Sequence, residues 1–384
     1  MDNNNLSIYI HWPFCKKKCP YCDFNSHVNK TELDEDLWIS AYHQSIDKFK
    51  HILQNKKIYS IFFGGGTPSL MPTRIVDELL KHIDQISSIS NCEITLEANP
   101  TSFEKAKFKE LKNIGINRLS IGIQSFNDKN LRFLGRQHSA KEAEETIIEA
   151  EKIFNNYSID LIYSLPNQTA EIWKQELEYA LKFAKHHISM YQLTIEKGTK
   201  FFSLFRDKKF TLPPEKVSHK LYTLTSSIAK QHGFTHYEIS NFAKAHKESQ
   251  HNLAYWKYQE YLGIGPGAHS RIKIGNKYNA FYMIHSPEKW LSTTTTGQSN
   301  IQENAVLSIE EIAHESLLMG LRLKEGINLK DFQYRFDANL LDFLDKDQIE
   351  LLINKKLMTH FNDRIYLKEK GRILINHILK QLIK

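Results

Sequence analysis

The chain has 384 residues, of which 41% are hydrophobic and 25% charged, and its net charge is +7. This length is too great for one small domain and predicts two domains, or one large α/β barrel with an appendage. No apolar run approaches the roughly 18 residues that a membrane-spanning helix needs, and the first five residues carry no positive charge typical of a signal peptide. These features predict a cytoplasmic protein, in which clustered cysteines are metal ligands more often than disulfides.

Six short apolar runs rich in β-branched residues predict strands, at residues 6–12, 58–65, 92–99, 118–125, 158–166 and 187–195. Segments with a 3.6-residue period predict the helices between them, at residues 31–52, 73–86, 103–114, 140–154 and 170–184. Strict alternation of strands and helices indicates a parallel sheet. Six such units without a dinucleotide-binding fingerprint predict an α/β fold, a partial (β/α)6 barrel with its site at the carboxyl ends of the strands.

After residue 199 the alternation ends. The pattern predicts a helix at 214–232, a strand at 235–242, loop-rich segments at 251–256 and 263–270, and a polar linker at 293–300. Three further helices, at 308–320, 329–334 and 340–354, precede a hairpin at 357–367 and a final helix, which predicts a small, mainly helical, winged-helix-like domain. We divide the chain into a barrel (1–240), an extension (241–300) and a C-terminal domain (301–384).

The last thirty residues are basic. From residue 355 onward the sequence has eight lysines and arginines against two acidic residues, which is +6 of the total charge. Such a segment is either a solvated face or a docking surface for an acidic partner, an anionic membrane face or nucleic acid.

Three cysteines, Cys15, Cys19 and Cys22, follow the first predicted strand with C-x3-C-x2-C spacing. Iron–sulfur clusters prefer thiolate ligands, and [4Fe–4S] clusters usually take four of them. Three thiolates would leave one iron open to a ligand that the protein does not supply. The spacing therefore favours a [4Fe–4S] cluster with one open iron.

Zinc is the alternative metal. A structural zinc site takes four ligands at paired spacings, and His11 and His27 could complete one with the cysteines. Three cysteines cannot all pair as disulfides. The remaining cysteine, Cys92, begins a predicted strand, which is typical of a small buried apolar residue.

The cysteine motif, with Tyr21 before its last cysteine, resembles that of the radical S-adenosylmethionine (SAM) superfamily. The resemblance implies that the amino and carboxylate groups of SAM chelate the open iron. One electron from the cluster, supplied by an electron donor, then cleaves SAM to methionine and a 5′-deoxyadenosyl radical. The partial barrel is the fold of this superfamily, so the motif and the predicted architecture agree.

The glycine-rich stretch "FFGGGTPSL" follows the second predicted strand. Glycines expose backbone groups and let a ligand approach closely, although Thr67 could instead cap a simple strand-to-helix turn. The stretch resembles the superfamily's SAM-binding motif, in the variant typical of oxygen-independent coproporphyrinogen III oxidase. This implies that Gly65, Gly66 and Thr67 contact SAM and that Glu97 accepts a hydrogen bond from its ribose. Otherwise Glu97 is an acid at a helix N-terminus.

Asp160 lies in an otherwise apolar strand, where a carboxylate is costly unless it has a partner, so we expect a cation or a hydroxyl beside it. The resemblance to the oxidase branch implies that Gln124, Arg136 and Asp160 line a second SAM or substrate position, with Thr194 nearby. An ion pair between Arg136 and Asp160 is the structural alternative. Tyr9 matches a tyrosine that faces the substrate or the cofactor in that branch, or it is a core residue.

Two features depart from the oxidase. Phe24 stands where the oxidase has a further cysteine, and the sequence begins almost at the first strand. Both departures are typical of a sister group, the HemW haem chaperones, as are "HNLAYW" and "GIGPGAHS". The resemblance implies that His251, Tyr255 and Trp256 contact haem, and an imidazole can ligate haem iron. A helix-start histidine packed on aromatic rings is the alternative.

We therefore expect a haem chaperone with a [4Fe–4S] cluster and SAM, which carries haem as cargo to a recipient such as a respiratory haemoprotein. Its basic tail would face that partner or the inner membrane surface. The alternative is coproporphyrinogen III oxidation, which Phe24 disfavours. A nucleic-acid-binding protein is a third alternative, but apart from the tail the sequence lacks the basic footprint of that class.

Overall fold

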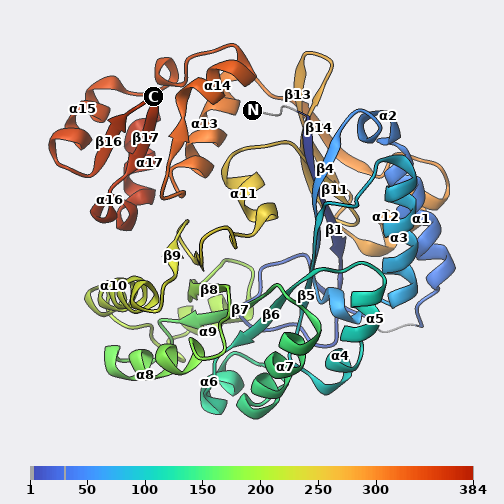
Figure 1. Cartoon of the computed structure of the whole chain (residues 1–384), viewed down its shortest axis with the longest axis horizontal. Coiled ribbons are helices and arrows are strands. Elements are labelled where there is room, and N and C mark those ends of the chain that lie inside the picture. Colours follow the sequence, from blue (N-terminus) through green and yellow to red (C-terminus); the bar gives the residue numbers. More distant parts are fainter. Residues whose placement is uncertain (1–3, 30–31, 384) are drawn as a thin grey trace.

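Six parallel strands form the middle of a curved, twelve-stranded sheet in the computed structural model, which describes residues 4–29 and 32–383 (Figure 1). They pair in the order β1 Asn5–Trp12, β4 Lys57–Gly65, β5 Glu93–Ala98, β6 Arg118–Gln124, β7 Tyr157–Tyr163 and β8 His187–Gln192. This arrangement confirms the predicted partial (β/α)6 barrel and its α/β class.

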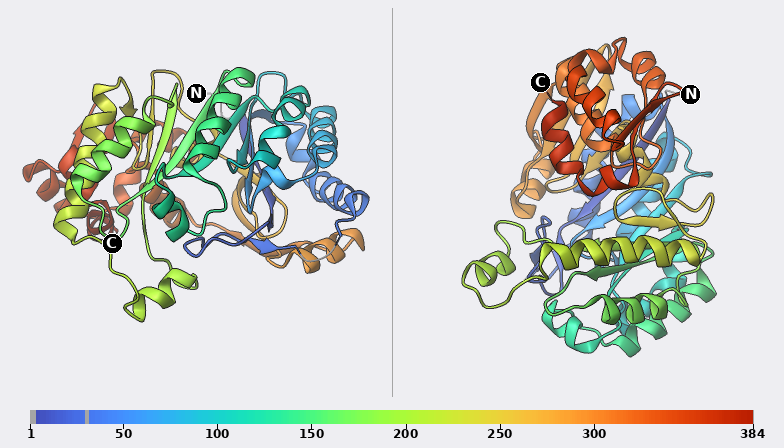
Figure 2. Two further views of the ribbon diagram at one scale, coloured as in Figure 1. Left: turned by 90° about the horizontal axis from the view of Figure 1, so that it is seen from below. Right: turned by 90° about the vertical axis from the view of Figure 1, so that its left-hand side faces the viewer.

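Helices cover the outer face of the sheet (Figures 1 and 2). In α3 the apolar side chains recur at helical spacing and are buried, which explains why this segment packs as a helix on the strands. Two predicted helices are each divided in two. The segment 31–52 forms α1 and α2, its first residue lying outside the described part, and 103–114 falls within α4 and α5. The bounds are α1 Glu35–Asp47, α2 Lys50–Leu53, α3 Thr73–Ile86, α4 Ser102–Ala106, α5 Phe108–Asn113, α6 Asp128–Phe133, α7 Ala140–Ile153, α8 Ala170–Ala180, α9 Lys200–Arg206 and α10 Glu215–Gln231.

Short strands from the second half extend both edges of the sheet. The predicted strand at 235–242 is two strands, β9 Thr235–His236 and β10 Asn241–Ala243, because the chain turns back between them and pairs antiparallel with itself and with β8. At the other edge β11 runs parallel to β1, and three antiparallel strands follow it. Their bounds are β11 Tyr261–Ile264, β12 His269–Ile274, β13 Lys277–Met283 and β14 Ile301–Val306.

The segment at 251–256, which we expected to be loop-rich, is a helix, α11 Gln250–Trp256. Ser249 caps it by accepting a hydrogen bond from the backbone N–H of Asn252. The carboxylate of Glu93 accepts from the N–H groups of Gln250 and His251, which the first helical turn leaves unpaired. In Figure 1 this helix lies inside the curve of the sheet.

The prediction that residues 293–300 form a linker is also wrong. The first part of this segment ends helix α12 Pro287–Thr295, where threonine hydroxyls donate to carbonyls one turn back. Thr294 and Asn300 are fully buried, and the Asn300 amide donates to Ser45 in α1. The segment therefore packs against the barrel.

The C-terminal part has its own apolar core and lies beside the barrel (Figure 2). It is mainly helical, as expected, and its first helix is followed by a short strand, two further helices, a hairpin that pairs with the short strand, and two final helices, an arrangement that is winged-helix-like. The predicted helix at 340–354 is broken, because Asp345 caps a new helix through the N–H of Gln348. The elements are α13 Ile309–Gly320, β15 Ile327–Asn328, α14 Leu329–Phe336, η2 Leu340–Phe343, α15 Lys346–Asn354, β16 Met358–Phe361, β17 Arg364–Leu367, α16 Glu369–Ile373 and α17 Ile375–Leu382. The domain boundaries at 240 and 300 remain a proposal.

Candidate cofactor and ligand site

Two adjoining cavities occupy the interior of the barrel. The first, of about 330 Å³, is lined by all three motif cysteines, and we call it the cysteine cavity. The second, of about 580 Å³, is lined by five histidines, and we call it the histidine cavity. The cavities share six lining residues, so a ligand in one faces a ligand in the other; these are Phe24, Gly65, Glu97, Ser120, Asp160 and Tyr191.

Cys15 ends β2 Phe14–Cys15, shortly after β1, and Cys19 and Cys22 lie in the loop between β2 and β3 His27–Val28. All three are free thiols. Thr67 donates to Sγ of Cys15 at 3.4 Å, and Nη1 of Arg136 lies 3.6 Å from Sγ of Cys19. Burial raises the pKa of Cys15 to about 11 and also raises that of Cys22. Since thiolates are the form that binds metal, loading the site must release these protons.

The two histidines beside this loop, His11 and His27, already form hydrogen bonds within the protein. The two ring nitrogens of His11 bond to the Tyr9 hydroxyl at 3.0 Å and to the carbonyl of Asn25 at 2.8 Å. His27 bonds through Nε2 to the Asn25 side chain. Over residues 4–29 and 32–383, no three His, Cys, Asp or Glu side chains converge on the position of one metal ion. A cubane cluster binds each thiolate through a different iron, so the three free thiols fit a cluster better than zinc. Cys92 is buried, as predicted.

The glycine-rich loop packs directly on the backbone that leads into the cysteines. The N–H of Gly66 donates to Trp12, and that of Thr67 to Phe14. A Cβ atom on Gly66 would lie 2.7 Å from the carbonyl oxygen of Phe14, closer than real Cβ atoms come. Thr67 does not cap the following turn, because its side chain bonds Cys15 and Asn99 instead. The loop therefore presents backbone to the cysteine cavity.

Glu97 lies within β5 and lines both cavities, so it is not an acid at a helix N-terminus. One carboxylate oxygen accepts from the N–H of Gly65 at 3.2 Å. Burial, with a smaller contribution from Asp160, raises the pKa of Glu97 to about 8. The other oxygen is available to a ligand hydroxyl.

This carboxyl group gives a pH dependence that can be measured. Below pH 8 the folded protein holds a proton on Glu97 that the unfolded chain releases above its ordinary pKa of 4.5. Without SAM, the contribution of Glu97 to the free energy of unfolding should therefore fall as the pH rises from 4.5 to about 8. In urea unfolding at a series of pH values, we expect the stability of wild type relative to Glu97→Gln to fall over this range. An identical slope of stability against pH in the variant would contradict the assignment.

Five of the six remaining predicted SAM residues also line the cysteine cavity, whereas the sixth, Tyr9, lines only the histidine cavity. Tyr21, Gln124, Arg136, Asp160 and Thr194 come from the loops and strands around the cysteine cavity. Arg136 donates to Asn99, to the Gly122 carbonyl at 2.8 Å and to Tyr21 at 3.4 Å.

Asp160 has a hydroxyl partner, as predicted: Ser120 donates to its Oδ2 at 2.9 Å. The alternative ion pair is wrong, because Arg136 has the partners named above and the described residues contain no Arg136–Asp160 pair within 4.0 Å. Oδ1 of Asp160 is buried without a partner. This orphaned oxygen and the glycine-lined wall fit a polar cofactor in the cavity.

The histidine cavity contains two of the three predicted haem residues together with Tyr9. His251 is 1% exposed and stacks on Phe62 with ring centroids 4.9 Å apart. Its Nδ1 lies 2.8 Å from Oγ of Ser60 and its Nε2 lies 3.3 Å from the Tyr255 hydroxyl. Burial lowers the pKa of His251 to about 3, so the imidazole is neutral, the form that ligates metals.

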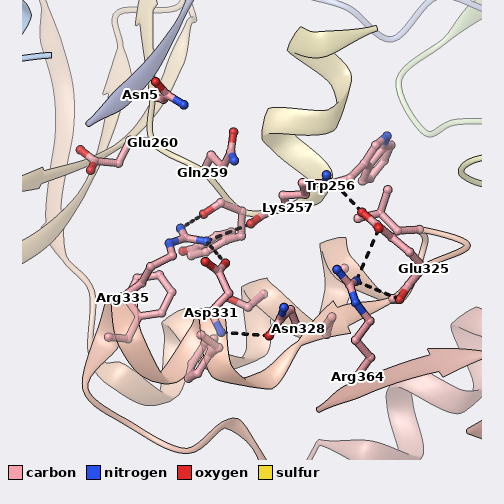
Figure 3. Close-up of a pocket in the computed structure, with 18 of the residues that line it drawn as sticks. Asn5, Trp256, Lys257, Gln259, Glu260, Glu325, Asn328, Asp331, Arg335 and Arg364 are labelled. Atoms are coloured by element: carbon pink, nitrogen blue, oxygen red, sulfur yellow. Dashed lines mark hydrogen bonds and ion pairs between the residues drawn. The ribbon is translucent and has the colours of Figure 1, made fainter. Parts of the chain in front are cut away.

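Trp256 is not in this cavity. It lines a third one, of about 410 Å³, between α11 and the C-terminal domain, beside Lys257 and Glu325 (Figure 3). The guanidinium of Arg322 lies over its ring, 5.9 Å from the centroid. His251 and Tyr255 are one helical turn apart and share a face, whereas Trp256 is rotated about 100° further. The predicted haem contact of Trp256 is therefore not supported.

Sequence reasoning missed two inward-facing residues of the histidine cavity, Arg118 and His187. They occupy the first positions of β6 and β8. The alternation of side chains along a strand could have indicated Arg118, since it lies on the same face of the strand as Ser120 and Gln124.

Comparisons with known proteins agree with this fold. Residues 9–180 match the family model of the radical SAM superfamily, and residues 307–374 match that of the HemN C-terminal domain. The solved structure of coproporphyrinogen III oxidase (HemN) from Escherichia coli has the same fold, with a TM-score of 0.82, 22% identity and coverage of 98% of this chain and 89% of that one. Fold and site define a radical SAM protein.

Two relatives indicate to which family within this superfamily the chain belongs. Heme chaperone HemW of Buchnera aphidicola subsp. Schizaphis graminum is 36% identical over 376 residues, 98% of this chain and 97% of its own. Radical S-adenosyl methionine domain-containing protein 1, mitochondrial, of Danio rerio is 34% identical over 385 residues, 98% of this chain and 86% of its own. The chain therefore belongs to the HemW family of the radical SAM superfamily, which implies a [4Fe–4S] cluster and SAM. No helix in the described part is long and apolar enough to cross a membrane.

Proposed function

We propose that this protein is a haem chaperone, which binds haem in the histidine cavity and delivers it to recipient haemoproteins, including respiratory ones. The supporting observation is the contact between that cavity and the cysteine cavity. Its volume of about 580 Å³ is in the range of about 300–1,000 Å³ typical of cofactor sites. The Buchnera relative is named a heme chaperone.

The cysteine cavity would hold the cofactors. Cys15, Cys19 and Cys22 would ligate the cluster, which with one open iron can chelate SAM and supply an electron to it. The chain's own residues would position SAM. The loop at Gly65 and Gly66 offers backbone hydrogen-bonding groups at close approach, and Glu97 offers a carboxylate oxygen; Tyr21, Thr67, Gln124, Arg136, Asp160 and Thr194 supply the remaining polar and aromatic wall.

Coproporphyrinogen III oxidation is the second candidate, favoured by the fold shared with HemN. Phe24 disfavours it, because this side chain lines both cavities, is 56% exposed and offers no thiol. Anaerobic incubation of cluster-loaded protein with coproporphyrinogen III, SAM and a reductant separates the two candidates. We expect no protoporphyrinogen, and its formation would favour the oxidase.

Replacing His251 tests the haem cavity. We expect wild-type protein to bind haem saturably, and His251→Ala to bind it at least about tenfold more weakly because an axial ligand is lost. Absorbance titration in the Soret region measures both. His219→Ala, on the exposed surface of α10, controls for haem that binds surface histidines and should behave like wild type. Equal affinities of wild type and His251→Ala would remove His251 as the ligand.

We further propose that the protein acts in the cytoplasm, with its basic tail toward the recipient or the inner membrane surface. The lysines of the tail support this, because Lys355, Lys356, Lys368, Lys370 and Lys380 are all exposed. Binding that weakens steeply as salt is raised is expected for such a surface.

A further inference from the structure

Arg118 is a buried cation without an ion-pair partner. It is 2% exposed and lines the histidine cavity. Its Nε atom has no hydrogen-bond partner, and among the residues that the structure describes no carboxylate oxygen lies within 4.0 Å of its guanidinium nitrogens. A guanidinium stays charged in proteins, and an unpaired buried charge is costly. The folded chain therefore holds a cation whose counterion it does not supply.

The two carboxyl groups that sense this charge are committed elsewhere. Glu93 accepts from the backbone N–H groups of Gln250 and His251. Asp160 accepts from Ser120. Burial raises the pKa of both carboxyl groups even though the charge of Arg118 acts in the opposite direction. Among the described residues, neither carboxyl group forms an ion pair with the guanidinium within 4.0 Å.

His187 adds a hydrogen-bond donor to the same wall. It is 1% exposed, lies opposite Ser158 in the β7–β8 pairing, and bonds through Nε2 to the Tyr237 hydroxyl at 2.9 Å. The tautomer in which the Tyr237 hydroxyl donates to Nε2 carries the ring proton on Nδ1. In the structure Nδ1 is buried without a hydrogen-bond partner.

An unpaired guanidinium beside an unpaired N–H is the donor set that a carboxylate accepts from. We propose that Arg118 and His187 form a carboxylate-binding subsite in the histidine cavity and that it holds a propionate group of haem. This inference rests on the proposed function. The other carboxylate source, SAM, belongs to the cysteine cavity, which Arg118 does not line.

Esterified haem tests the subsite. Cluster-loaded full-length protein is titrated with haem and with haem dimethyl ester, whose propionates are neutral. We expect wild type to bind the ester about 10- to 100-fold more weakly than haem, the loss typical of a hydrogen bond to a charged group. Arg118→Met should bind haem and ester with equal affinity and bind SAM as wild type does. His187→Phe should reduce the preference for haem over the ester by a smaller factor.

Arg271→Gln is the matched control. Arg271 is also buried, but it is paired with Glu315 at 2.8 Å and lies outside the histidine cavity. We expect its substitution to lower the melting temperature and leave the preference for haem over the ester unchanged. Arg118→Lys, which keeps the charge and loses the planar fork, gives an intermediate preference and serves if the methionine variant does not fold.

The outcomes of these titrations distinguish a failure of the subsite from a failure of the proposed function. Equal binding of haem and ester by wild type overturns the subsite and leaves haem binding intact. The subsite is also overturned if Arg118→Met and Arg118→Lys both keep the wild-type preference for haem over the ester. The same holds if Arg118→Met loses SAM affinity while its preference for haem is unchanged. Failure of wild type to bind either compound removes the proposed function itself.

Discussion

Replacing Cys19 with serine is expected to abolish the iron–sulfur cluster. The loop offers three thiols to a site that normally takes four ligands, so no spare thiolate can compensate. The cysteine cavity also loses the sulfur beside Arg136. Iron and sulfide content after anaerobic reconstitution, together with the visible absorbance of the cluster, should fall from the wild-type level to near zero. SAM affinity should fall with them, since the open iron would chelate SAM.

Cys92→Ser is the matched control. This thiol is 4% exposed among apolar neighbours and does not line the cysteine cavity. We expect the variant to load a full cluster and to lose some stability, because a hydroxyl replaces a buried sulfur. Wild-type iron content in Cys19→Ser would contradict the assignment of the cluster to the three-cysteine loop.

The second large effect is expected for Gly66→Ala. The added methyl group would meet the carbonyl oxygen, carbon and nitrogen of Phe14 at 2.7 to 2.9 Å, and backbone atoms cannot rotate away. The loop must therefore shift, and with it the strand that leads to Cys15. We expect SAM affinity to fall by more than tenfold and stability to fall by about 1–3 kcal/mol, the usual cost of overpacking. Anaerobic calorimetry with SAM and urea unfolding measure the two effects.

Gly122→Ala separates crowding of the backbone from crowding of side chains. A Cβ atom there would approach Nε2 of Gln124 at 2.8 Å and Nη2 of Arg136 at 3.5 Å, which are ends of side chains that can move. Its stability loss should be clearly smaller than that of Gly66→Ala. If Gly66→Ala binds SAM and unfolds as wild type does, the loop does not position the cofactor.

The barrel and the cysteine cavity could be predicted because their signals are local. Strand and helix periods follow each other in the sequence, and parallel pairing brings every βα loop to one end of the sheet. Glu97 and Asp160 therefore meet around one cavity although 63 residues separate their numbers.

The histidine cavity could not be predicted, because contacts between residues far apart in the sequence form it and no local pattern contains them. Helix α11 lies inside the barrel because Glu93, more than 150 residues earlier in the chain, caps its first turn. Because this segment was predicted to be a loop, its helical period was not considered. The side chains of Tyr255 and Trp256, which point in different directions on the helix, were therefore assigned to the same site. Arg118 was missed because an arginine at the start of a strand is usually exposed, and its lack of a partner is visible only in three dimensions.

Haem transfer tests the central claim most directly. Cluster-loaded protein carrying one haem is mixed anaerobically with an excess of an apo-haemoprotein, and the Soret band is followed in time. The account predicts that the spectrum of the loaded chaperone gives way to that of the acceptor. A chain that never takes up haem, or that keeps it in the presence of excess acceptor, would contradict the assignment as a haem chaperone.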